Sequence, residues 1–503
     1  MKALYLAMIL VLAVVALGAQ VNGNIQYFGD KAVLHVWGDH WERGVAQGYY
    51  LGEGVMDVFQ QFYFTMVAFS NPDYYNYLGT YYQQHFVTDP DLLSEAQGVI
   101  SGMQQAGVSL YHSGLQRDLG AADLLQANAL LDLMQLVQPE GGSKLKLGCA
   151  SLSSWGVSTL QDTLLAGSSV ITRFLDWSLN DALLSNPVLV VHHPSEEDEQ
   201  EWMSFTYPGL IGGLSGINSS RTGAFLNVGN DHSASVYQNL TPIFWDVRRG
   251  LESSDYNSDG LGTSLDVFDS IADGLHLTGT VTHCVSENAG DIVPVVVETN
   301  NSGTVARYYN MNGNLPGENL AATNHFRLLT YPTCCTRYAN IQDSLNANSN
   351  MTAKRQWRVL SGAAGMDDNL AAIQYVPSTG AILWSSATFS LPAFQTPAIT
   401  LNAQDLFDFP VSAQDELAPS ASTSVSCYPN PLAGSAALNL KSSLPLRACT
   451  LFNLRGQKVL SGEFSAPKNE LQLDLPGLPN GLYLLRLQDG RGLSVLKKVV
   501  VNG

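Results

Sequence analysis

The amino-acid sequence predicts an α+β fold, in which packed β-sheets are flanked by helices, followed by a small all-β sandwich domain. Apolar residues recur at helical spacing over residues 40–137, whereas residues 149–410 break into short runs of β-branched and aromatic residues separated by turn signals. A linker rich in Ser, Ala and Asp, 411–424, then separates a last set of short strands, 425–503. Helices and strands that alternate in blocks in this way are typical of an α+β architecture.

Residues 1–19 read as a signal peptide. One lysine is followed by an apolar run from Ala3 to Leu17 and then by small residues, which is the pattern of a basic region, an apolar core and a cleavage site. We expect cleavage after Gly18 or Ala19. The alternative is an N-terminal membrane anchor, but a spanning helix needs about 20 apolar residues. No later segment is long and apolar enough to span a bilayer.

The composition of the chain argues against a nucleic-acid partner. Asp and Glu number 44 against 25 Lys and Arg, which gives a formal net charge of -19. Nucleic-acid binding depends on clustered basic side chains that neutralise phosphates. An acidic balance fits a soluble exported protein, while it says nothing about the fold.

Residues 20–148 are predicted to be mainly helical. The segments "HWERGVAQGYYLGEGVMDVF", "DPDLLSEAQGVISGMQQAG" and "AADLLQANALLDLMQLV" carry apolar residues at helical spacing, with Asp at or near the start of the last two. From residue 149 short strands prevail, and helical signal returns at "SLDVFDSIADGL" and "TRYANIQDSL". The region 149–410 is therefore expected to hold the sheets.

Six cysteines are too few for the disulfide framework of a small exported protein. They are Cys149, Cys284, Cys334, Cys335, Cys427 and Cys449. The last two lie close together in the C-terminal domain and could bridge there. No Cys-x-x-Cys or His-x-x-x-His pattern occurs, so we predict no zinc site and no cofactor for catalysis.

The pair Gly148-Cys149 opens a run of small residues, and three interpretations compete for the cysteine: half of a disulfide, a core residue, or a nucleophile. A nucleophilic thiol needs a base beside it. If the chain is cut after Gly148, Cys149 becomes an N-terminus whose α-amine, with a pKa of about 8, can take the thiol proton. Glycine in front of it permits the strained turn that self-cleavage requires.

Downstream, "TRFLDW" places Arg173 and Asp176 three residues apart near the end of a predicted strand. Asp176 could hold the new ammonium group or orient the amine, and Arg173 could favour the thiolate. Taken alone, the two residues also fit an ordinary surface salt bridge.

The segment "GCASLSSWG…RFLDW" resembles the start of the nucleophile chain in the penicillin acyltransferase-like (acyl-CoA:6-aminopenicillanic acid acyltransferase) branch of the N-terminal nucleophile (Ntn) hydrolases. Members read Gly-Cys-[Ser/Thr], then Trp-Gly, then Arg-x-[Leu/Phe]-Asp-[Trp/Phe]. "ERGVAQG", "YPGLIGGLSGINSSRTGAFLN", "ATNHF" and "TRYANI" are similar to further family elements, so the resemblance covers roughly residues 30–405. It implies a four-layer αββα sandwich.

The resemblance also implies roles for particular residues. Cys149 would be the nucleophile, released by self-cleavage between Gly148 and Cys149. Arg173 and Asp176 would orient and charge it.

Three further residues match the family by position. Asn218 in "SGINSS" would contribute to the oxyanion hole, and Asn324 in "ATNHF" would bind the tetrahedral oxyanion or the free amine. Arg337 in "TRYANI" would support the transition state. Structural alternatives remain for each of them: a turn residue, a strand-end cap and a surface charge on a helix. The segment "VSTLQDTLLAGSSVIT" is longer than its family counterpart, which puts the substrate pocket in doubt more than the nucleophile.

The segment "DYNSDGLGTSLD" spaces oxygen-bearing side chains like a calcium-binding loop. The expected ligands of a structural Ca²⁺ ion are Asp255, Asn257, Asp259, Thr263 and Asp266, with Gly260 at the sharp turn. The alternative is a solvated turn of Asp, Asn, Ser and Gly.

The C-terminal domain carries "YPNPL", "LFNLRGQKV", "LPNGLYLLRL" and "LKKVVV", in this order. These segments resemble the C-terminal sorting domain of the type IX secretion system. The resemblance implies a secreted or cell-surface location, reached by export across the outer membrane, with the secretion machinery as a partner. The alternative is an unrelated carbohydrate-binding sandwich.

Together these features predict a secreted, self-processing cysteine Ntn hydrolase or acyltransferase that acts on a linear amide bond in a small acylated or lipid-like substrate. Two alternatives remain open. One is a phospholipase B-like or acid-ceramidase-like lipid amidase of the same fold. The other is a surface-displayed binding protein that keeps the fold but is never cut.

Overall fold

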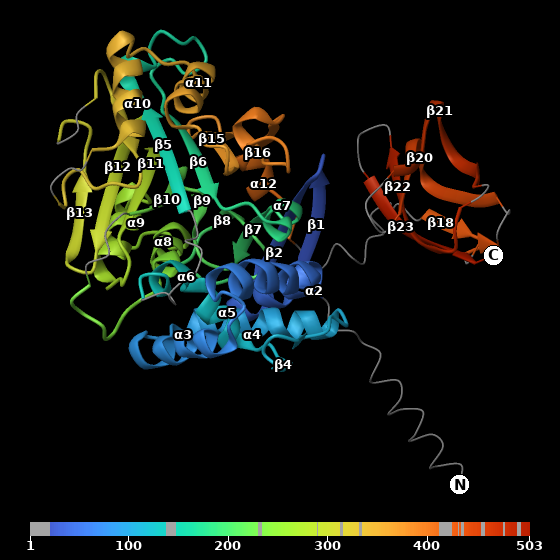
Figure 1. The fold of residues 1–503 in the computed structure, drawn as a ribbon. Helices are drawn as coiled ribbons and strands as arrows, with labels where there is room; N and C mark the ends of the chain where they lie inside the picture. Colours follow the sequence, from blue (N-terminus) through green and yellow to red (C-terminus); the bar gives the residue numbers. More distant parts are fainter. Residues whose placement is uncertain are drawn as a thin grey trace. The chain divides into compact units, whose positions relative to one another are not determined.

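The computed structural model describes residues 21–136, 147–229, 234–288, 290–311, 315–330, 334–411, 425–430, 432–433, 437–453, 458–475, 478–489 and 494–502. The chain divides into two compact units, one through Val411 and one from Ser412 onward (Figure 1). The predicted signal peptide and nearly all of the predicted linker lie outside the described residues.

A nine-stranded sheet forms the larger layer of the first unit among the described residues. All neighbouring strands run antiparallel except β2 and β7, which are parallel. In spatial order the strands are β1 (Gly23–Phe28), β2 (Lys31–Gly38), β7 (Val188–Pro194), β8 (Trp202–Thr206), β9 (Ser215–Asn218), β10 (Thr222–Val228), β11 (Thr280–Asn288), β12 (Asp291–Asn300) and β13 (Gly303–Arg307).

A second, six-stranded antiparallel sheet carries the strand that begins near the predicted cut. In spatial order its described strands are β14 (Asn319–Ala322), β5 (Leu147–Ser154), β6 (Val170–Trp177), β15 (Asn369–Val376), β16 (Ala381–Ser386) and β17 (Ile399–Asn402).

Twelve α-helical and π-helical segments, two short strands and the 3₁₀ turns η2 (Gly156–Ser158) and η3 (Ala393–Gln395) complete the described part of this unit. The N-terminal ones are α2 (His40–Val58), the π-helix η1 (Phe59–Val67), α3 (Pro72–His85), α4 (Pro90–Gln105), β3 (Tyr111–His112), β4 (Arg117–Asp118), α5 (Ala121–Asn128) and α6 (Leu130–Leu133). The later ones are α7 (Asp181–Ser185), α8 (Ile243–Glu252), α9 (Ser264–Asp273), α10 (Thr336–Ala347), α11 (Ala353–Ala364) and α12 (Ala403–Phe407).

The two sheets pack face to face between layers of helices. Ile171 and Tyr375 of the smaller sheet meet Phe205 and Phe225 of the larger one in a shared apolar core. Helices α2, α8 and α9 contact the larger sheet, and α10 and α11 contact the smaller one (Figure 1). This is the four-layer αββα arrangement that the resemblance to Ntn hydrolases implies, so the predicted fold class is confirmed.

Two strands precede the first helix, where the sequence analysis expected mainly helices. The segment "GNIQYFGDKAVLHVWG" folds into the hairpin β1–β2, which turns at Gly29 and Asp30. Gly29 has a φ of 65°, a conformation that glycine adopts at little cost. Apolar and β-branched residues on both sides of a Gly-Asp turn are a hairpin signal, and the expectation of helices overlooked it.

Helices α2 and α4 cross in close contact because glycines line their interface. A Cβ atom at Gly44 would lie 2.1 Å from the carbonyl oxygen of Glu95, and one at Gly48 would lie 1.9 Å from that of Val99. The motif "ERGVAQG" therefore has a structural use here. It lets α2 approach α4 closely enough to bring its first turn beside the Glu95 side chain.

The second unit is all-β, as predicted, and its described strands join into one six-stranded, nearly barrel-shaped sheet. They are β18 (Val425–Tyr428), β19 (Leu432–Ala433), β20 (Ala437–Asn453), β21 (Lys458–Asp474), β22 (Gly481–Asp489) and β23 (Ser494–Asn502). Cys427 and Cys449 do not form the bridge considered above, and the other cysteines are also free thiols. No described helix has the length and hydropathy of a membrane span.

Candidate active site

Cys149 lies on β5 with its side chain fully buried between the two sheets. Its strand neighbours fix its direction, because Ala150 and Leu152 face α10 and α11 in an apolar cluster, and alternate residues of a strand face opposite ways. In the antiparallel register Cys149 pairs with Leu175, and Gly148 pairs with Asp176. The two motifs "GCAS" and "RFLDW" are therefore adjacent strands of one sheet.

The thiol of Cys149 sits beside a buried cation. Arg173 Nη2 lies 3.6 Å from Sγ and donates to the carbonyl oxygen of Leu226 at 2.9 Å. Burial raises the pKa of the Cys149 thiol, while the charge of Arg173 and backbone hydrogen bonds from Asp176 and Val228 oppose that rise. Burial also lowers the pKa of Arg173, whose Nε and Nη1 atoms have no hydrogen-bond partner. The pKa of the Cys149 thiol is raised overall, and the charge of Arg173 is the largest of the effects that oppose the rise.

The backbone nitrogen of Cys149 is held separately from its sulfur. It donates to Asn324 Oδ1 at 3.0 Å, and Asn324 Nδ2 donates to the carbonyl oxygen of Val228 at 2.6 Å. Arg337 Nη2 also donates to Asn324 Oδ1. Asn324 is therefore fixed with its oxygen toward the atom that cleavage would convert into an α-amine.

Asp176 is the buried carboxylate of the site. It accepts hydrogen bonds from Arg337 Nη1 at 3.1 Å and from Asn369 Nδ2 at 3.0 Å. Burial raises the pKa of Asp176 to about 6, although the charge of Arg337 and the Asn369 hydrogen bond act in the opposite direction. A carboxyl group with a pKa near 6 can exchange a proton at neutral pH.

The structure brings together five of the six side chains predicted for the site: Cys149, Arg173, Asp176, Asn324 and Arg337. Their chemical roles stay predictions.

The sixth, Asn218, lies elsewhere. It ends β9, donates to the carbonyl oxygen of Leu251 at 3.0 Å and accepts from the backbone N–H of Thr222 at 2.9 Å. Leu226, which contacts Arg173, lies four residues beyond Thr222, or roughly 13 Å along an extended strand. Asn218 thus serves as a turn residue between β9 and β10, and its placement in the oxyanion hole needs correction.

Two asparagines in the site escaped the sequence analysis. Asn369 opens β15 and positions Asp176. Asn227 ends the segment "TGAFLN" on β10, between Leu226 and Val228, and donates to Ser151 Oγ at 3.3 Å. Alternation along β10 places Asn227 on the same face as the core residue Phe225, which was a usable signal for it.

In the predicted calcium loop, carboxylate groups accept hydrogen bonds from backbone N–H groups of the same loop. Asp255 accepts from the N–H groups of Asp259 at 3.1 Å and Gly260 at 2.9 Å. Asp266 accepts from the N–H of Thr263 at 2.6 Å, and the two form the capping box that begins α9. Calcium binding at this loop remains a prediction.

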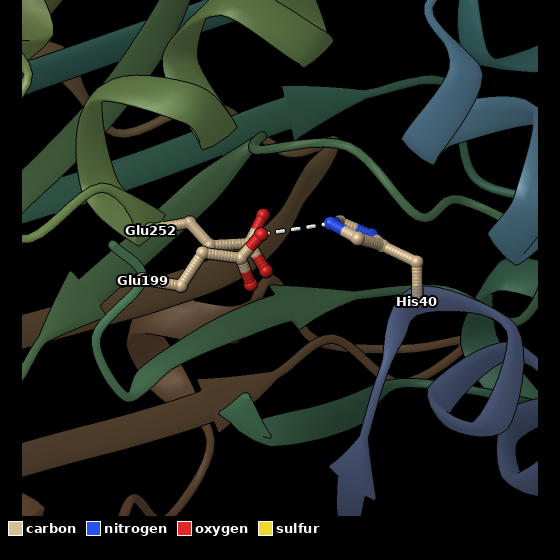
Figure 2. A group of neighbouring side chains, drawn as sticks. All are labelled: His40, Glu199 and Glu252. Carbon is tan, nitrogen blue, oxygen red and sulfur yellow. Dashed lines mark hydrogen bonds and ion pairs between the residues drawn. The ribbon is translucent and has the colours of Figure 1, made fainter. Parts of the chain in front are cut away.

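One cluster among the described residues has the composition of a metal site, and it lies outside the Cys149 site. His40 at the start of α2 reaches toward the carboxylates of Glu199 and Glu252, and their ligand atoms lie within 4.8 Å of one another (Figure 2). His40 Nδ1 and Nε2 are already hydrogen-bonded, to Glu95 at 3.1 Å and to Glu199 at 2.8 Å. Burial lowers the pKa of His40, but these two glutamates raise it to about 9.

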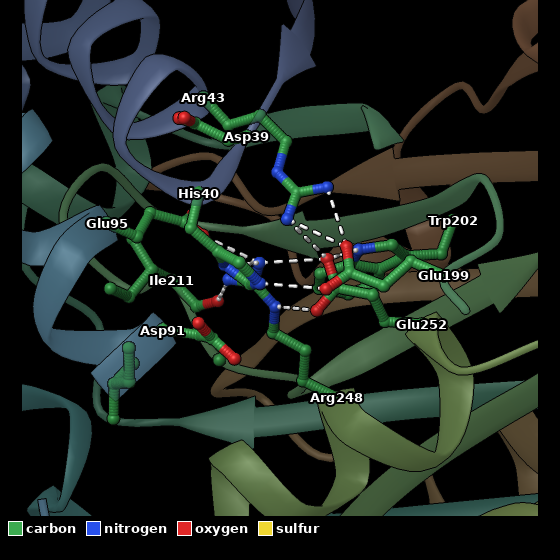
Figure 3. A network of polar contacts seen from close by, with 12 residues as sticks. Asp39, His40, Arg43, Asp91, Glu95, Glu199, Trp202, Ile211, Arg248 and Glu252 are labelled. Atoms are coloured by element: carbon green, nitrogen blue, oxygen red, sulfur yellow. Dashed lines mark hydrogen bonds and ion pairs between the residues drawn. The ribbon is translucent and has the colours of Figure 1, made fainter. Parts of the chain in front are cut away.

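Two arginines complete this cluster and form ion pairs with its carboxylates. Arg43 Nη2 lies 2.9 Å from Glu199, and Arg248 contacts Glu95 at 2.6 Å and Glu252 at 2.7 Å (Figure 3). A metal ligand must be a neutral imidazole or a free carboxylate. The donor set therefore does not fit a metal ion, and we call these six residues the ion cluster: His40, Arg43, Glu95, Glu199, Arg248 and Glu252.

Comparison with known proteins identifies the last unit. Residues 426–502 match the family model of the secretion system C-terminal sorting domain. The second unit is a secretion sorting domain. It directs the chain across the outer membrane to the cell surface or the exterior, as predicted.

The first unit has more distant relatives. The chain is 24% identical over 241 residues to protein dcd1B of Dictyostelium discoideum, covering 47% of this chain and 46% of that protein. The chain thus spans about half the length of this curated relative.

Two solved structures are similar to half of the chain. A Caenorhabditis elegans ortholog of N-acylethanolamine-hydrolyzing acid amidase has 15% identity and a TM-score of 0.33, over 50% of this chain and all of that one. A mutant of conjugated bile acid hydrolase from Clostridium perfringens has 8% identity and a TM-score of 0.31, over 50% of this chain and 93% of that one.

Proposed function

We propose that the first unit is a self-processing cysteine amidase or acyltransferase that breaks a linear amide bond, with Cys149 as its nucleophile. One observation carries the proposal: a single buried residue has a cation 3.6 Å from its sulfur and an amide oxygen 3.0 Å from its backbone nitrogen. A disulfide half or a plain core cysteine needs neither partner. Both partners have a use if the sulfur and the nitrogen of Cys149 react together.

In the uncut chain no α-amine exists, so another base must start the self-cleavage. Asp176 pairs with Gly148 in the sheet and has a pKa raised to about 6, and we assign to it the transfer of the thiol proton to the departing nitrogen. The thiolate attacks the carbonyl carbon of Gly148. The Gly148–Cys149 C–N bond breaks, and the nitrogen receives the proton from Asp176. Water then hydrolyses the thioester, which frees the thiol and leaves a carboxylate on Gly148.

Cleavage turns the backbone nitrogen of Cys149 into an α-amine that Asn324 Oδ1 keeps in place. With an intrinsic pKa of about 8 this amine takes the thiol proton. The thiolate attacks the substrate carbonyl, and the ammonium group protonates the departing nitrogen, so that an acyl thioester forms. Because Asn324 Nδ2 is engaged by Val228, Asn324 suits the role of amine holder better than that of oxyanion donor.

The acyl group is released from the thioester by water or by a second amine. The α-amine deprotonates the incoming molecule and returns the proton to the sulfur. Hydrolysis gives an amidase, and transfer to an amine gives an acyltransferase. Both outcomes use the same residues of the site.

The surroundings of the site favour an apolar acyl group. The core cluster that buries Cys149 also contains Phe62, Tyr63 and Leu210, and Phe62 stacks on Trp177 with ring centroids 5.6 Å apart. Those three residues line a small apolar cavity of about 20 Å³. Because this volume is close to that of one water molecule, an acyl chain enters only if the lining side chains move apart.

The experiment that tests the proposal compares intact masses of purified wild type and Cys149→Ala. We expect two fragments from the wild type, the second beginning at Cys149, and one uncut chain from the variant. Cys284→Ala is the matched control, because Cys284 is equally buried but lies on β11, outside the contacts of Arg173 and Asn324. An uncut wild-type chain would favour the surface-displayed binding protein instead.

A further inference from the structure

A fully buried histidine bridges two serines of the nucleophile strand. His283 on β11 contacts Ser151 Oγ through Nδ1 at 2.9 Å and Ser153 Oγ through Nε2 at 2.8 Å. Asn227 on β10 donates to the same Ser151 Oγ at 3.3 Å. None of these four side chains is exposed to solvent. The structure thus contains a continuous hydrogen-bond chain from Ser153 to Asn227 inside the sandwich.

The chain ends beside the nucleophile. Cys149, Ser151 and Ser153 are alternate residues of β5, so their side chains share one face of the strand. Asn227 immediately precedes Val228, whose backbone N–H bonds to the Cys149 sulfur and whose carbonyl holds Asn324. The peptide group that follows Asn227 therefore contacts the Cys149 sulfur, and the Asn227 side chain contacts Ser151.

His283 carries one proton donor and one acceptor at working pH. Burial lowers the pKa of His283 to about 3, and the charge of Arg307 acts in the same direction, so the ring is neutral. The two tautomers of the His283 ring give the hydrogen bonds between Ser153, His283, Ser151 and Asn227 opposite donor-to-acceptor directions. With the proton on Nε2, Nδ1 accepts from Ser151 and Ser151 accepts from the Asn227 amide nitrogen. With the proton on Nδ1, Ser151 receives from His283 and donates to the Asn227 amide oxygen.

In either direction one polar end of Asn227 stays unpaired. With its nitrogen on Ser151, its Oδ1 atom is buried without any hydrogen-bond partner. Leaving a buried polar group unsatisfied costs about 1–3 kcal/mol. A half-turn of the amide exchanges the two ends and leaves the N–H donors unpaired instead. An unsatisfied amide next to a nucleophile offers a hydrogen bond to an atom of the substrate.

We propose that His283 is a positioning residue: through Ser151 it holds the Asn227 amide with its N–H donors toward the oxyanion that forms when Cys149 attacks a carbonyl. The productive tautomer carries its proton on Nδ1. This tautomer requires Ser153 to donate to Nε2, 2.8 Å away, rather than to the carbonyl oxygen of Leu320, 3.5 Å away. The inference rests on the proposed function, because an oxyanion forms only if Cys149 attacks a carbonyl. It assigns to Asn227 the role that the sequence analysis had given to Asn218.

The first test separates oxyanion stabilisation from thiol reactivity. Hydrolysis of decanoyl p-nitroanilide by the processed enzyme passes through an oxyanion, whereas alkylation of Cys149 by iodoacetamide does not. For His283→Phe and Ser151→Ala we expect kcat to fall about 100-fold, the loss seen when one oxyanion donor is removed, with KM and the alkylation rate within about twofold of wild type. Ser153→Ala removes the group that donates to Nε2 in the productive tautomer, so its kcat should fall as well.

A parallel loss of hydrolysis and alkylation in these variants would mean that His283 only supports the fold, and would overturn the proposal. Cys284→Ala is the matched control, since Cys284 neighbours His283 on β11 and is equally buried. Its kcat should stay near that of wild type.

The second test does not depend on activity. Nitrogen-15 chemical shifts of labelled histidine in the full chain report the His283 tautomer directly. We expect a neutral ring protonated on Nδ1 from pH 5 to pH 9 and a changed tautomer in Ser153→Ala. A ring protonated on Nε2 throughout, or one that titrates in this range, would refute the role of His283. A wild type that fails to hydrolyse any amide but shows the expected tautomer would instead refute the proposed function.

Discussion

The Cys149 site and the ion cluster are both buried and polar, yet the protein treats their charges in opposite ways. Burial opposes ionisation in both. In the ion cluster the neighbouring opposite charges outweigh it, so the pKa of Glu95 lies well below its usual value and that of Arg248 is raised. In the Cys149 site burial prevails, so the pKa of Asp176 is raised and that of Arg173 is lowered.

This contrast distinguishes a structural charge cluster from a reactive one. The ion cluster balances three carboxylates with two guanidinium groups and the protonated His40, and each charge stabilises the fold. The Cys149 site keeps a cation and a carboxylate that are held at a cost in stability. The Asp176 carboxyl group, with its pKa raised to about 6, can therefore exchange a proton near neutral pH, which chemistry requires and a fold does not. Four predictions test this contrast.

The largest expected effect is the loss of turnover in Cys149→Ala with little loss of stability. We expect hydrolysis of decanoyl p-nitroanilide to fall at least about 1000-fold, as when a nucleophile is removed. The free energy of unfolding should change by no more than about 1 kcal/mol, since only one small side chain is truncated. Urea unfolding and initial rates measure the two quantities. Turnover that survives the substitution would assign the chemistry to another residue.

The opposite pattern is expected in the ion cluster. Arg248→Ala removes the buried guanidinium that contacts both Glu95 and Glu252, and breaking a buried ion pair costs about 3–5 kcal/mol. The kcat of the folded fraction should match that of wild type. Arg249→Ala is the matched control one residue along α8. Its side chain is 38% exposed, so we expect a change within about 0.5 kcal/mol. Equal losses for both arginines would contradict the structural role of the ion cluster.

The pH dependence of stability should separate the two regions. Asp176 has a folded pKa above its unfolded value, so its contribution is full below about pH 4 and is lost as the pH rises through 6. The folded pKa of His40 is also above its unfolded value. Its contribution to the free energy of unfolding is full below about pH 6.5 and is lost as the pH rises through 9. Each loss is on the order of 3 kcal/mol.

Urea unfolding of wild type, Asp176→Asn and His40→Gln at pH 4, 6.5 and 9 measures these losses. We expect the first variant to remove the loss below pH 6.5 and the second to remove the loss above it. Stability that rises through either window on account of these groups would contradict the assigned environments.

The smallest effect concerns the residue that the structure moves out of the site. Asn218→Ala should lower the free energy of unfolding by about 1–2 kcal/mol through its lost turn hydrogen bonds, while kcat stays within about twofold of wild type. Asn324→Ala should instead reduce kcat by two orders of magnitude or so, because the amine loses its acceptor. Steady-state kinetics of both variants measure these changes. A larger loss of kcat in Asn218→Ala than in Asn324→Ala would contradict the placement of Asn218 outside the site.

The parts of the site that could be predicted are those carried by short, local patterns. Cys149, Arg173 and Asp176 lie in two motifs on neighbouring strands, so the segment between them needs only to turn back. Asn324 and Arg337 came from the resemblance, since neither has a local pattern that reveals its partner. Asn218 was assigned to the site and Asn227 was not considered, because the sequence of a hairpin does not show which of its ends meets the second sheet.

The ion cluster could not be predicted from the sequence. His40, Glu95 and Arg248 lie on three helices, and Glu199 lies on a loop, so no spacing links them. Their contact depends on the close α2–α4 crossing at Gly44 and Gly48 and on the packing of α8 against the larger sheet. The fold class, in contrast, could be predicted from the helical and strand periodicity of long segments of the sequence, because those segments form whole helical or sheet layers of the sandwich.

The most direct test of the central claim is the mass of the acylated protein. Wild type is mixed with p-nitrophenyl decanoate, quenched in acid within seconds and digested for peptide mapping. The account predicts one decanoyl group, as a hydroxylamine-labile thioester, on a peptide whose first residue is Cys149. An acyl group on any other residue, or on Cys149 within an uncut Gly148–Cys149 peptide, would contradict it.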